Sequence, residues 1–205
     1  MTYSESRTSD VAGAQLVADG AVLTYTQDPE HVMPRHFISE PAYAEAVAGL
    51  VIVCTDAVIV DRVNETFYLA RRRHLPMAGL WWIGGRMNAG ELETASIVRA
   101  FKRETQLDLA PNRFTLVPGG LTRYFWSERE QDPQSVGSDN LCYTFAVELT
   151  ADELSQAAVK LDPEEYDARA GLRPYGHNDL QFLLAQGQLH PVIWEIYQRV
   201  FGESI

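Results

Sequence analysis

The chain has 205 residues, of which 46% are hydrophobic and 22% are charged, a balance that suits one globular domain with an extension. Its formal net charge of −11 argues against broad contact with nucleic acid or an anionic membrane, because polyanions require a basic surface. No run approaches the roughly 18 apolar residues of a membrane span, and the N-terminus lacks a secretion-signal pattern. These features predict a cytoplasmic protein. Cys54 and Cys142 lie in apolar runs and are expected to be buried, reduced thiols.

Residues 1–38 are predicted to form an N-terminal extension, and residues 39–205 the main domain. In the extension, a polar tail at 1–12 precedes two short apolar stretches, at 15–25 and 31–38. Whether this extension covers a site or contributes to a dimer contact stays open. A helix is predicted to start at Ser39-Glu40-Pro41 and to stop at Gly49, because serine caps helices and proline is tolerated in the first turn.

The main domain continues with alternating strand-like and helix-like segments. Predicted strands cover 50–61, 66–71, 80–83, 114–121, 122–126 and 141–149, and predicted helices cover 91–106, 178–185 and 191–201. This irregular alternation predicts an α/β fold in which a mixed sheet lies between helical layers.

The segment from 84 to 107 carries the most chemical information. Ile97 and Phe101 share the helix face that is expected to pack on the sheet. Arg99, Arg103 and Glu104 share the other face, because residues three and four apart are neighbours on a helix. The glycine pair before this helix suggests a loop whose backbone can approach a phosphate closely. The segment therefore predicts a phosphate-binding surface with one carboxylate and two arginines.

The spacing of these residues resembles the signature of the Nudix hydrolase superfamily, which implies a Nudix-type α/β/α sandwich. Four signature positions are kept, by Gly85, Glu91, Arg99 and Glu104. Ala100 and Arg103 stand where the family carries metal-binding glutamates, and Gln106 replaces a glycine. The signature is therefore a degenerate one.

The two lost acids disfavour the multi-metal cluster with which Nudix pyrophosphatases activate water against phosphorus. One Mg²⁺, or Mn²⁺ in its place, stays compatible with the sequence, because Mg²⁺ often uses only one or two protein carboxylates. Glu104, the Gly84 carbonyl and Glu164 are the expected metal ligands.

One Nudix branch, the GDP-mannose mannosyl hydrolases, shows a similar loss and cleaves the sugar carbon–oxygen bond. The resemblance implies a catalytic role for Asp56, which lies inside the first long predicted strand of the main domain. It also implies that Arg86, Arg99 and Arg72 (or its neighbour Arg71) bind the leaving diphosphate. A homodimer is a further implication of this resemblance.

The general base is less clearly marked. The branch places a Gln-His pair before its last helices, whereas the corresponding segment here is acidic and has no histidine, at 161–167. Glu165 or Asp167 is therefore the expected base.

Three functions follow from the sequence. The leading hypothesis is a hydrolase that acts on a nucleoside diphosphate sugar or a related derivative, a small-molecule substrate. A non-catalytic module that binds nucleotides is the first alternative, since the retained arginines would be enough for binding. The second alternative is a pyrophosphatase that takes metal ligands from outside the signature helix, such as Asp139 and Glu164.

Overall fold

The computed structural model describes residues 15–19, 22–26, 30–34, 36 and 38–202. The chain divides into two compact units, Met1–His36 and Phe37–Ile205. In the first unit, β1 (Gln15–Asp19) and β2 (Leu23–Thr26) pair antiparallel. The polar tail predicted at 1–12 lies outside the described residues.

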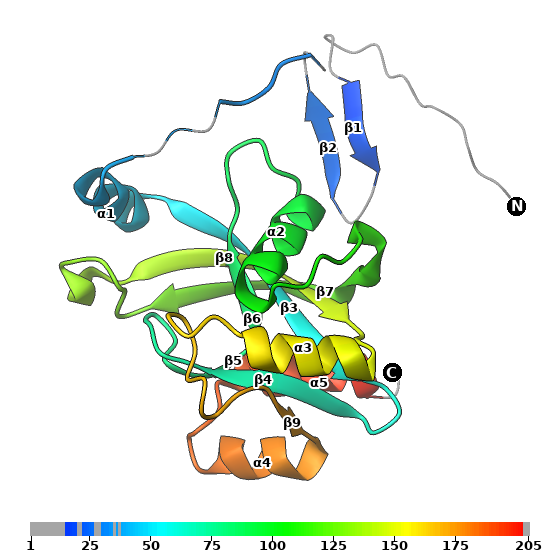
Figure 1. The fold of residues 1–205 in the computed structure, drawn as a ribbon. Coiled ribbons are helices and arrows are strands. Elements are labelled where there is room, and N and C mark those ends of the chain that lie inside the picture. Colours follow the sequence, from blue (N-terminus) through cyan, green and yellow to red (C-terminus); the bar gives the residue numbers. More distant parts are fainter. Residues whose placement is uncertain (1–14, 20–21, 27–29, 35, 37, 203–205) are drawn as a thin grey trace, which may run out of the picture. The chain divides into compact units, whose positions relative to one another are not determined.

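Within the described residues, the second unit is built on a seven-stranded mixed sheet (Figure 1). Its central strand, β3 (Val51–Asp61), runs parallel to β8 (Ser138–Val147) and antiparallel to β4 (Thr66–Arg72) and β6 (Ile83–Arg86). The outer strands are β7 (Phe114–Trp126) beside β8, and β5 (Gly79–Trp81) and β9 (Arg173–Tyr175) beside β4.

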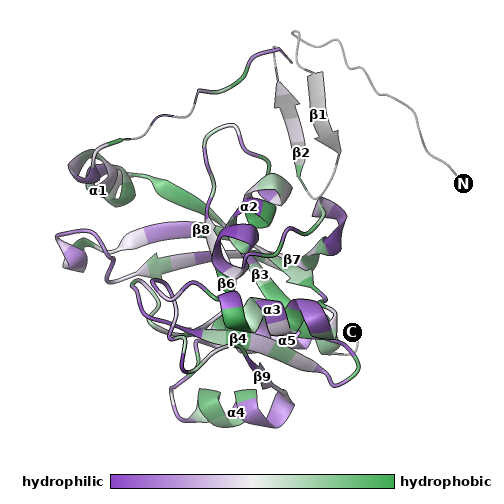
Figure 2. Ribbon diagram, viewed as in Figure 1, coloured by the Kyte–Doolittle hydropathy of each residue, from purple (hydrophilic) through white to green (hydrophobic). Residues whose placement is uncertain are grey.

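Helices cover both faces of this sheet. α2 (Glu93–Thr105) and α3 (Ala151–Lys160) cover one face, and α4 (His177–Ala185) and α5 (Pro191–Phe201) cover the other. The first core cluster joins Val58 of β3 to Leu180 and Ile193, and the second joins Ile59 to Ile97 and Phe101. Figure 2 shows both hydrophobic and hydrophilic stretches on α2 and α3, as expected for helices that pack with one face. The predicted α/β fold with a mixed sheet between helices is confirmed.

Several element boundaries differ from the prediction. α1 (Glu40–Gly49) forms as predicted, with Ser39 as its N-cap. The two strands predicted at 114–126 are one strand, β7, with a register shift between Leu116 and Leu121. β9 and α3 were not predicted, although α3 begins with a capping box made by Thr150 and Glu153.

The glycine pair lies inside a strand and not in a loop. Gly84 and Gly85 belong to β6 and stand opposite Asp56 and Thr55 of β3. A Cβ atom on Gly84 would collide with the Asp56 carboxyl and the Thr55 carbonyl. The absence of a side chain therefore lets β6 approach β3 where the Asp56 carboxyl needs the space.

None of the helices among the described residues is long and apolar enough to cross a bilayer.

Candidate functional site

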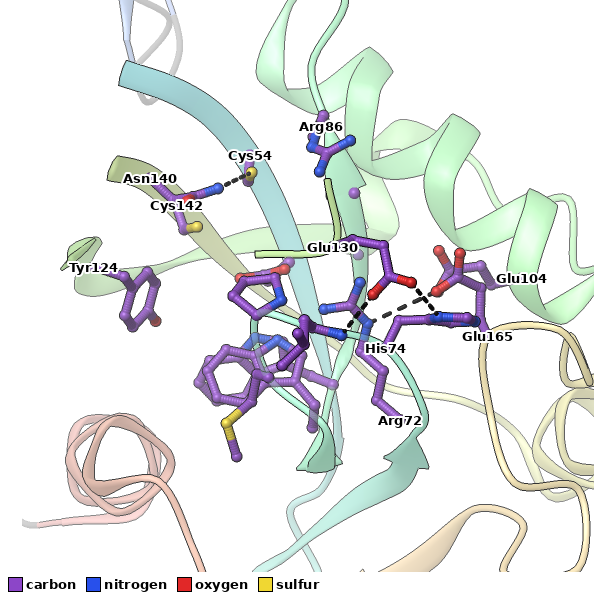
Figure 3. A pocket seen from close by; sticks show the side chains of 18 of the residues that line it. Cys54, Arg72, His74, Arg86, Glu104, Tyr124, Glu130, Asn140, Cys142 and Glu165 are labelled. Carbon is purple, nitrogen blue, oxygen red and sulfur yellow. Dashed lines mark hydrogen bonds and ion pairs between the residues drawn. The ribbon is translucent and has the colours of Figure 1, made fainter. Parts of the chain in front are cut away.

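A pocket of about 510 Å³ in the second unit brings most of the predicted site residues together. Seven of the nine line it: Asp56, Arg72, Gly84, Arg86, Arg99, Glu104 and Glu165. The other two, Glu164 and Asp167, do not line it. Figure 3 shows Arg72, Glu104 and Glu165 gathered on one side of the pocket, and Tyr124 and Cys142 on the other.

Asp56 is a buried carboxyl in the middle of the sheet, with 6% of its surface exposed. Burial raises the pKa of this carboxyl to about 7, while the Trp82 indole and the Arg72 guanidinium oppose the rise. The group therefore changes protonation near neutral pH. A carboxyl of this kind can accept or donate a proton during a reaction.

Glu104 of α2 is held by two partners. One carboxylate oxygen accepts a hydrogen bond from the Arg103 guanidinium, and the other accepts one of 2.5 Å from the Tyr166 hydroxyl. Glu104 is only 2% exposed, and burial raises its pKa against the lowering effects of Tyr166 and Arg103. Tyr166 is itself buried and reaches Glu104 from the segment before β9. Sequence reasoning missed this tyrosine, because nothing in the local pattern places residue 166 beside residue 104.

Arg99 acts as a clamp on the segment between β6 and α2. Its guanidinium donates two hydrogen bonds to Glu91, of 2.6 and 2.7 Å, and one of 2.8 Å to the Arg86 carbonyl. Glu91 also accepts the backbone N–H of Asn88. Arg99 lines the pocket, but its Nε and Nη2 atoms are engaged by Glu91 and by the Arg86 carbonyl, which supports a positioning role.

The other predicted arginines have weaker partners. Arg72 lies 3.7 Å from the Glu165 carboxylate. Arg86 packs its guanidinium over the Tyr43 ring of α1, 4.7 Å from the ring centre. Neither contact uses the bidentate geometry that Arg99 makes with Glu91. Both guanidinium groups can therefore turn toward an anion in the pocket.

The acidic segment at 161–167 is fixed along the end of β4. The backbone N–H of Arg73 donates to the Glu165 carbonyl, and that of Asp167 donates to the Arg71 carbonyl. The Asp167 carboxylate accepts the backbone N–H of Arg169. This arrangement turns Glu165 to the pocket and leaves Asp167 outside it.

His74 lines the pocket but was not among the predicted site residues. Its Nε2 atom lies 2.8 Å from the Glu164 carbonyl, and its Nδ1 atom lies 3.3 Å from the Glu130 carboxylate. The Glu164 carbonyl raises the pKa of His74, and Glu130 adds to the rise. His74 thereby ties the segment after β4 to the acidic segment. A histidine in a turn carries no sequence signal for such a contact.

An aromatic wall closes the other side of the pocket. Tyr124 and Trp126 of β7 stack with ring centres 5.1 Å apart, and Trp81 meets both edge-on. Trp82 is buried, and its indole lowers the pKa of the Asp56 carboxyl, which also lines the pocket. Nearby, Cys54 and Cys142 stand opposite each other on β3 and β8 as free, buried thiols.

The residues do not suit the divalent cation that Nudix hydrolases typically use. Among the described residues, no group of three or more histidine, cysteine, aspartate or glutamate side chains could hold a metal ion. Both oxygens of Glu104 are already bonded, and a guanidinium lies on one of them. Glu164 uses its carbonyl to bind His74 and does not line the pocket. Asp139, another candidate ligand, is paired with Arg123 at 2.6 and 2.9 Å.

Comparison with known proteins finds similarity only at the level of structure. No family model and no curated protein sequence matches the chain. A NUDIX hydrolase from Nitrosomonas europaea is 16% identical, with a TM-score of 0.49 over 74% of this chain and 88% of that one. A MutT NUDIX hydrolase from Burkholderia pseudomallei is 16% identical, with a TM-score of 0.47 over 69% of this chain and 99% of that one. The E. coli dihydroneopterin triphosphate pyrophosphohydrolase is 14% identical, with a TM-score of 0.48 over 74% of this chain and 96% of that one.

Proposed function

We propose that this protein is a Nudix-type hydrolase that cleaves a nucleoside diphosphate sugar, or a related derivative, at the sugar carbon–oxygen bond. The observation that carries the proposal is the pocket itself. It joins a cluster of arginines to a buried carboxyl, Asp56, whose pKa is about 7. The spacing of the degenerate signature at 85–107 agrees with this assignment.

The arginines would bind the diphosphate. Arg72 and Arg86 line the pocket without bidentate protein partners, and Arg103 also reaches it. Guanidinium groups match phosphate oxygens in shape and keep their charge at every relevant pH. The aromatic wall of Trp81, Tyr124 and Trp126 would contact the base or the sugar, because planar rings stack on such groups.

Asp56 would act as the general base. Cleavage breaks the bond between the anomeric carbon and the bridging phosphate oxygen, and water adds to that carbon. Asp56 would take the proton of this water, and the electron pair of the broken bond would leave with the diphosphate. The arginines would stabilise the negative charge of the leaving group. Arg99 would position Glu91 and the segment after β6.

Cleavage at carbon fits these residues better than cleavage at phosphorus. Pyrophosphate hydrolysis by metal-activated water requires several free oxygen ligands. The ligands considered for that reaction, Asp139 and Glu164, are bonded elsewhere or lie outside the pocket. We therefore do not propose pyrophosphatase activity.

A second candidate, a non-catalytic nucleotide-binding module, is favoured by one observation. Glu104, the last acid of the signature helix, is bonded through both of its oxygens. A pocket used for binding alone would need the arginines and not Asp56.

Incubation with a panel of nucleotide sugars separates the two candidates. A hydrolase releases nucleoside diphosphate, and Asp56→Asn abolishes turnover while ligand still raises the melting temperature. Asp61→Asn, at the last position of β3 and outside the pocket, is the matched control and should keep full turnover. Stabilisation of the wild type by nucleotides without any turnover would identify a binding module. No stabilisation and no turnover across the panel would refute both.

A further inference from the structure

Arg103 places a positive charge beside the last acid of the signature helix. Its guanidinium is bonded to Glu104, and its side chain is 50% exposed. The same guanidinium lies over β6, where a Cβ atom on Gly85 would come within 3.3 Å of its Nη2 atom. Arg103 thus occupies the space between the last acid of the signature helix and the glycine pair.

Glu104 is poorly placed to bind a cation, because both of its oxygens already accept hydrogen bonds and one of the donors is a guanidinium. The Tyr166 hydroxyl occupies its second oxygen at 2.5 Å, and both side chains are buried. A divalent cation at Glu104 would have to share the carboxylate with a guanidinium and a buried hydroxyl. It would also sit beside the fixed positive charge of Arg103, which repels it.

Arg103 has donors to spare for a ligand. A guanidinium carries five N–H groups in a fork that matches phosphate. In the part of the chain that the structure describes, the Arg103 side chain donates its hydrogen bond to the Glu104 carboxylate. Glu104 orients the group, and the half-exposed side chain of Arg103 lines the pocket.

We propose that the Arg103–Glu104 pair takes the place of a divalent cation, so that the pocket binds the diphosphate of its ligand directly and without metal. This inference rests on the proposed function. Arg103 supplies the positive charge that a metal would otherwise supply, and Glu104 and Tyr166 fix its position. The pair therefore makes the pocket select a free diphosphate over a diphosphate that carries a bound cation.

The test is calorimetric titration of the full chain with GDP, once with EDTA and once with excess Mg²⁺. We expect the wild type to bind GDP in EDTA at least as tightly as with Mg²⁺. Arg103→Gln keeps a donor for Glu104 but removes the charge, and should weaken binding in EDTA roughly 10- to 100-fold. Lys102→Gln removes a positive charge at the preceding position of α2, which lies outside the pocket. This variant should bind GDP with the affinity of the wild type.

The outcomes are distinct. A wild type that binds GDP only with Mg²⁺ would overturn the inference and leave the proposed function intact. Equal affinities of Arg103→Gln and the wild type in EDTA would also overturn it, provided that the variant melts as the wild type does. If the variant melts early, Arg103→Lys, which keeps the charge, replaces it and should bind without Mg²⁺. If the wild type does not bind GDP, the same titrations are made with ADP, CDP and UDP, and failure to bind any of them would refute the proposed function and the inference together.

Discussion

At the scale of single residues, the burial of ionisable groups sets what the pocket can do. Asp56 is surrounded by the sheet and by Trp82, and only 6% of its surface is exposed. The cost of removing a carboxylate from water explains why its pKa rises so far. The same burial that tunes this group for proton transfer should lower the stability of the protein at high pH.

Replacing Asp56 by Asn should change how stability depends on pH. Because the folded-state pKa of about 7 lies above the ordinary value of 3.8, the folded protein holds its proton more tightly than the unfolded chain. Stability is therefore lost as the pH rises from about 4 through about 7. Asp56→Asn should match the wild type near pH 4 and exceed it above pH 8, by at most ~4 kcal/mol. Urea unfolding across this range measures the difference.

Asp61 provides a control of opposite sign. Hydrogen bonds from Asn64 lower the pKa of this exposed carboxyl, so the stability that it contributes is present at high pH and is lost on acidification. Asp61→Asn should be less stable than the wild type above pH 8. A pH-independent gap between Asp56→Asn and the wild type would show that Asp56 has an ordinary pKa.

Arg99 should matter for stability as well as for the pocket. Its partner Glu91 has a side chain only 6% exposed, so Arg99→Met would leave that carboxylate buried without its two strongest donors. We expect a loss of ~2–4 kcal/mol in the free energy of unfolding. Lys102→Met, on the same helix, breaks an exposed pair with Asp108 and should cost at most ~1 kcal/mol. Equal losses of unfolding free energy in the two variants would contradict the stabilising role of the Arg99–Glu91 pair.

The residues that the sequence predicted are those with local signals. Asp56 stands out because aspartate is rare inside strands, and Arg99 because helical spacing places it on the same face as Arg103. His74 and Tyr166 could not be predicted, because their contacts join segments that are 62 to 90 residues apart in the chain. Sequence patterns report periodicity and not such distant contacts.

At the scale of elements, β6 is the strand that shapes the pocket floor. Its glycines were predicted as a loop because the pattern Gly-Gly is typical of turns. The pairing of β6 with β3 overrides that preference. The missing side chain of Gly84 leaves room for Asp56, and that of Gly85 leaves room for Arg103. The prediction failed because glycine also marks close approach between strands.

Alanine at each of the two glycines should give different results. A Cβ on Gly84 meets the Thr55 backbone carbonyl, which cannot move, so Gly84→Ala should lose ~1–3 kcal/mol of stability. A Cβ on Gly85 meets the end of the Arg103 side chain, which can move. Gly85→Ala should therefore fold normally but bind GDP more weakly. Thermal unfolding and GDP titration of both variants measure this, and equal stability losses would contradict the geometry.

At the scale of the whole molecule, the core and the pocket belong to the second unit. Every residue of the two core clusters, and every residue that lines the pocket, lies between positions 47 and 201. The alternation of strands and helices predicted this architecture, because each element buries one face against another. The order of the strands and the pairing of β6 depend on contacts between distant segments and were not predicted.

We propose that the second unit folds without the first. A chain that starts at Ile38 should unfold cooperatively at the melting temperature of the full chain, since it keeps all the core residues that the structure describes. Circular dichroism during heating measures this. Loss of the cooperative transition would assign the first 37 residues a part in folding.

The most direct test of the proposed reaction is hydrolysis of a nucleotide sugar in water enriched in oxygen-18. Attack at the anomeric carbon places the heavy oxygen in the free sugar, and mass spectrometry of the products locates it. We predict label in the sugar, unlabelled nucleoside diphosphate, and no product from Asp56→Asn. Label in a phosphate product would instead show attack at phosphorus and contradict the account.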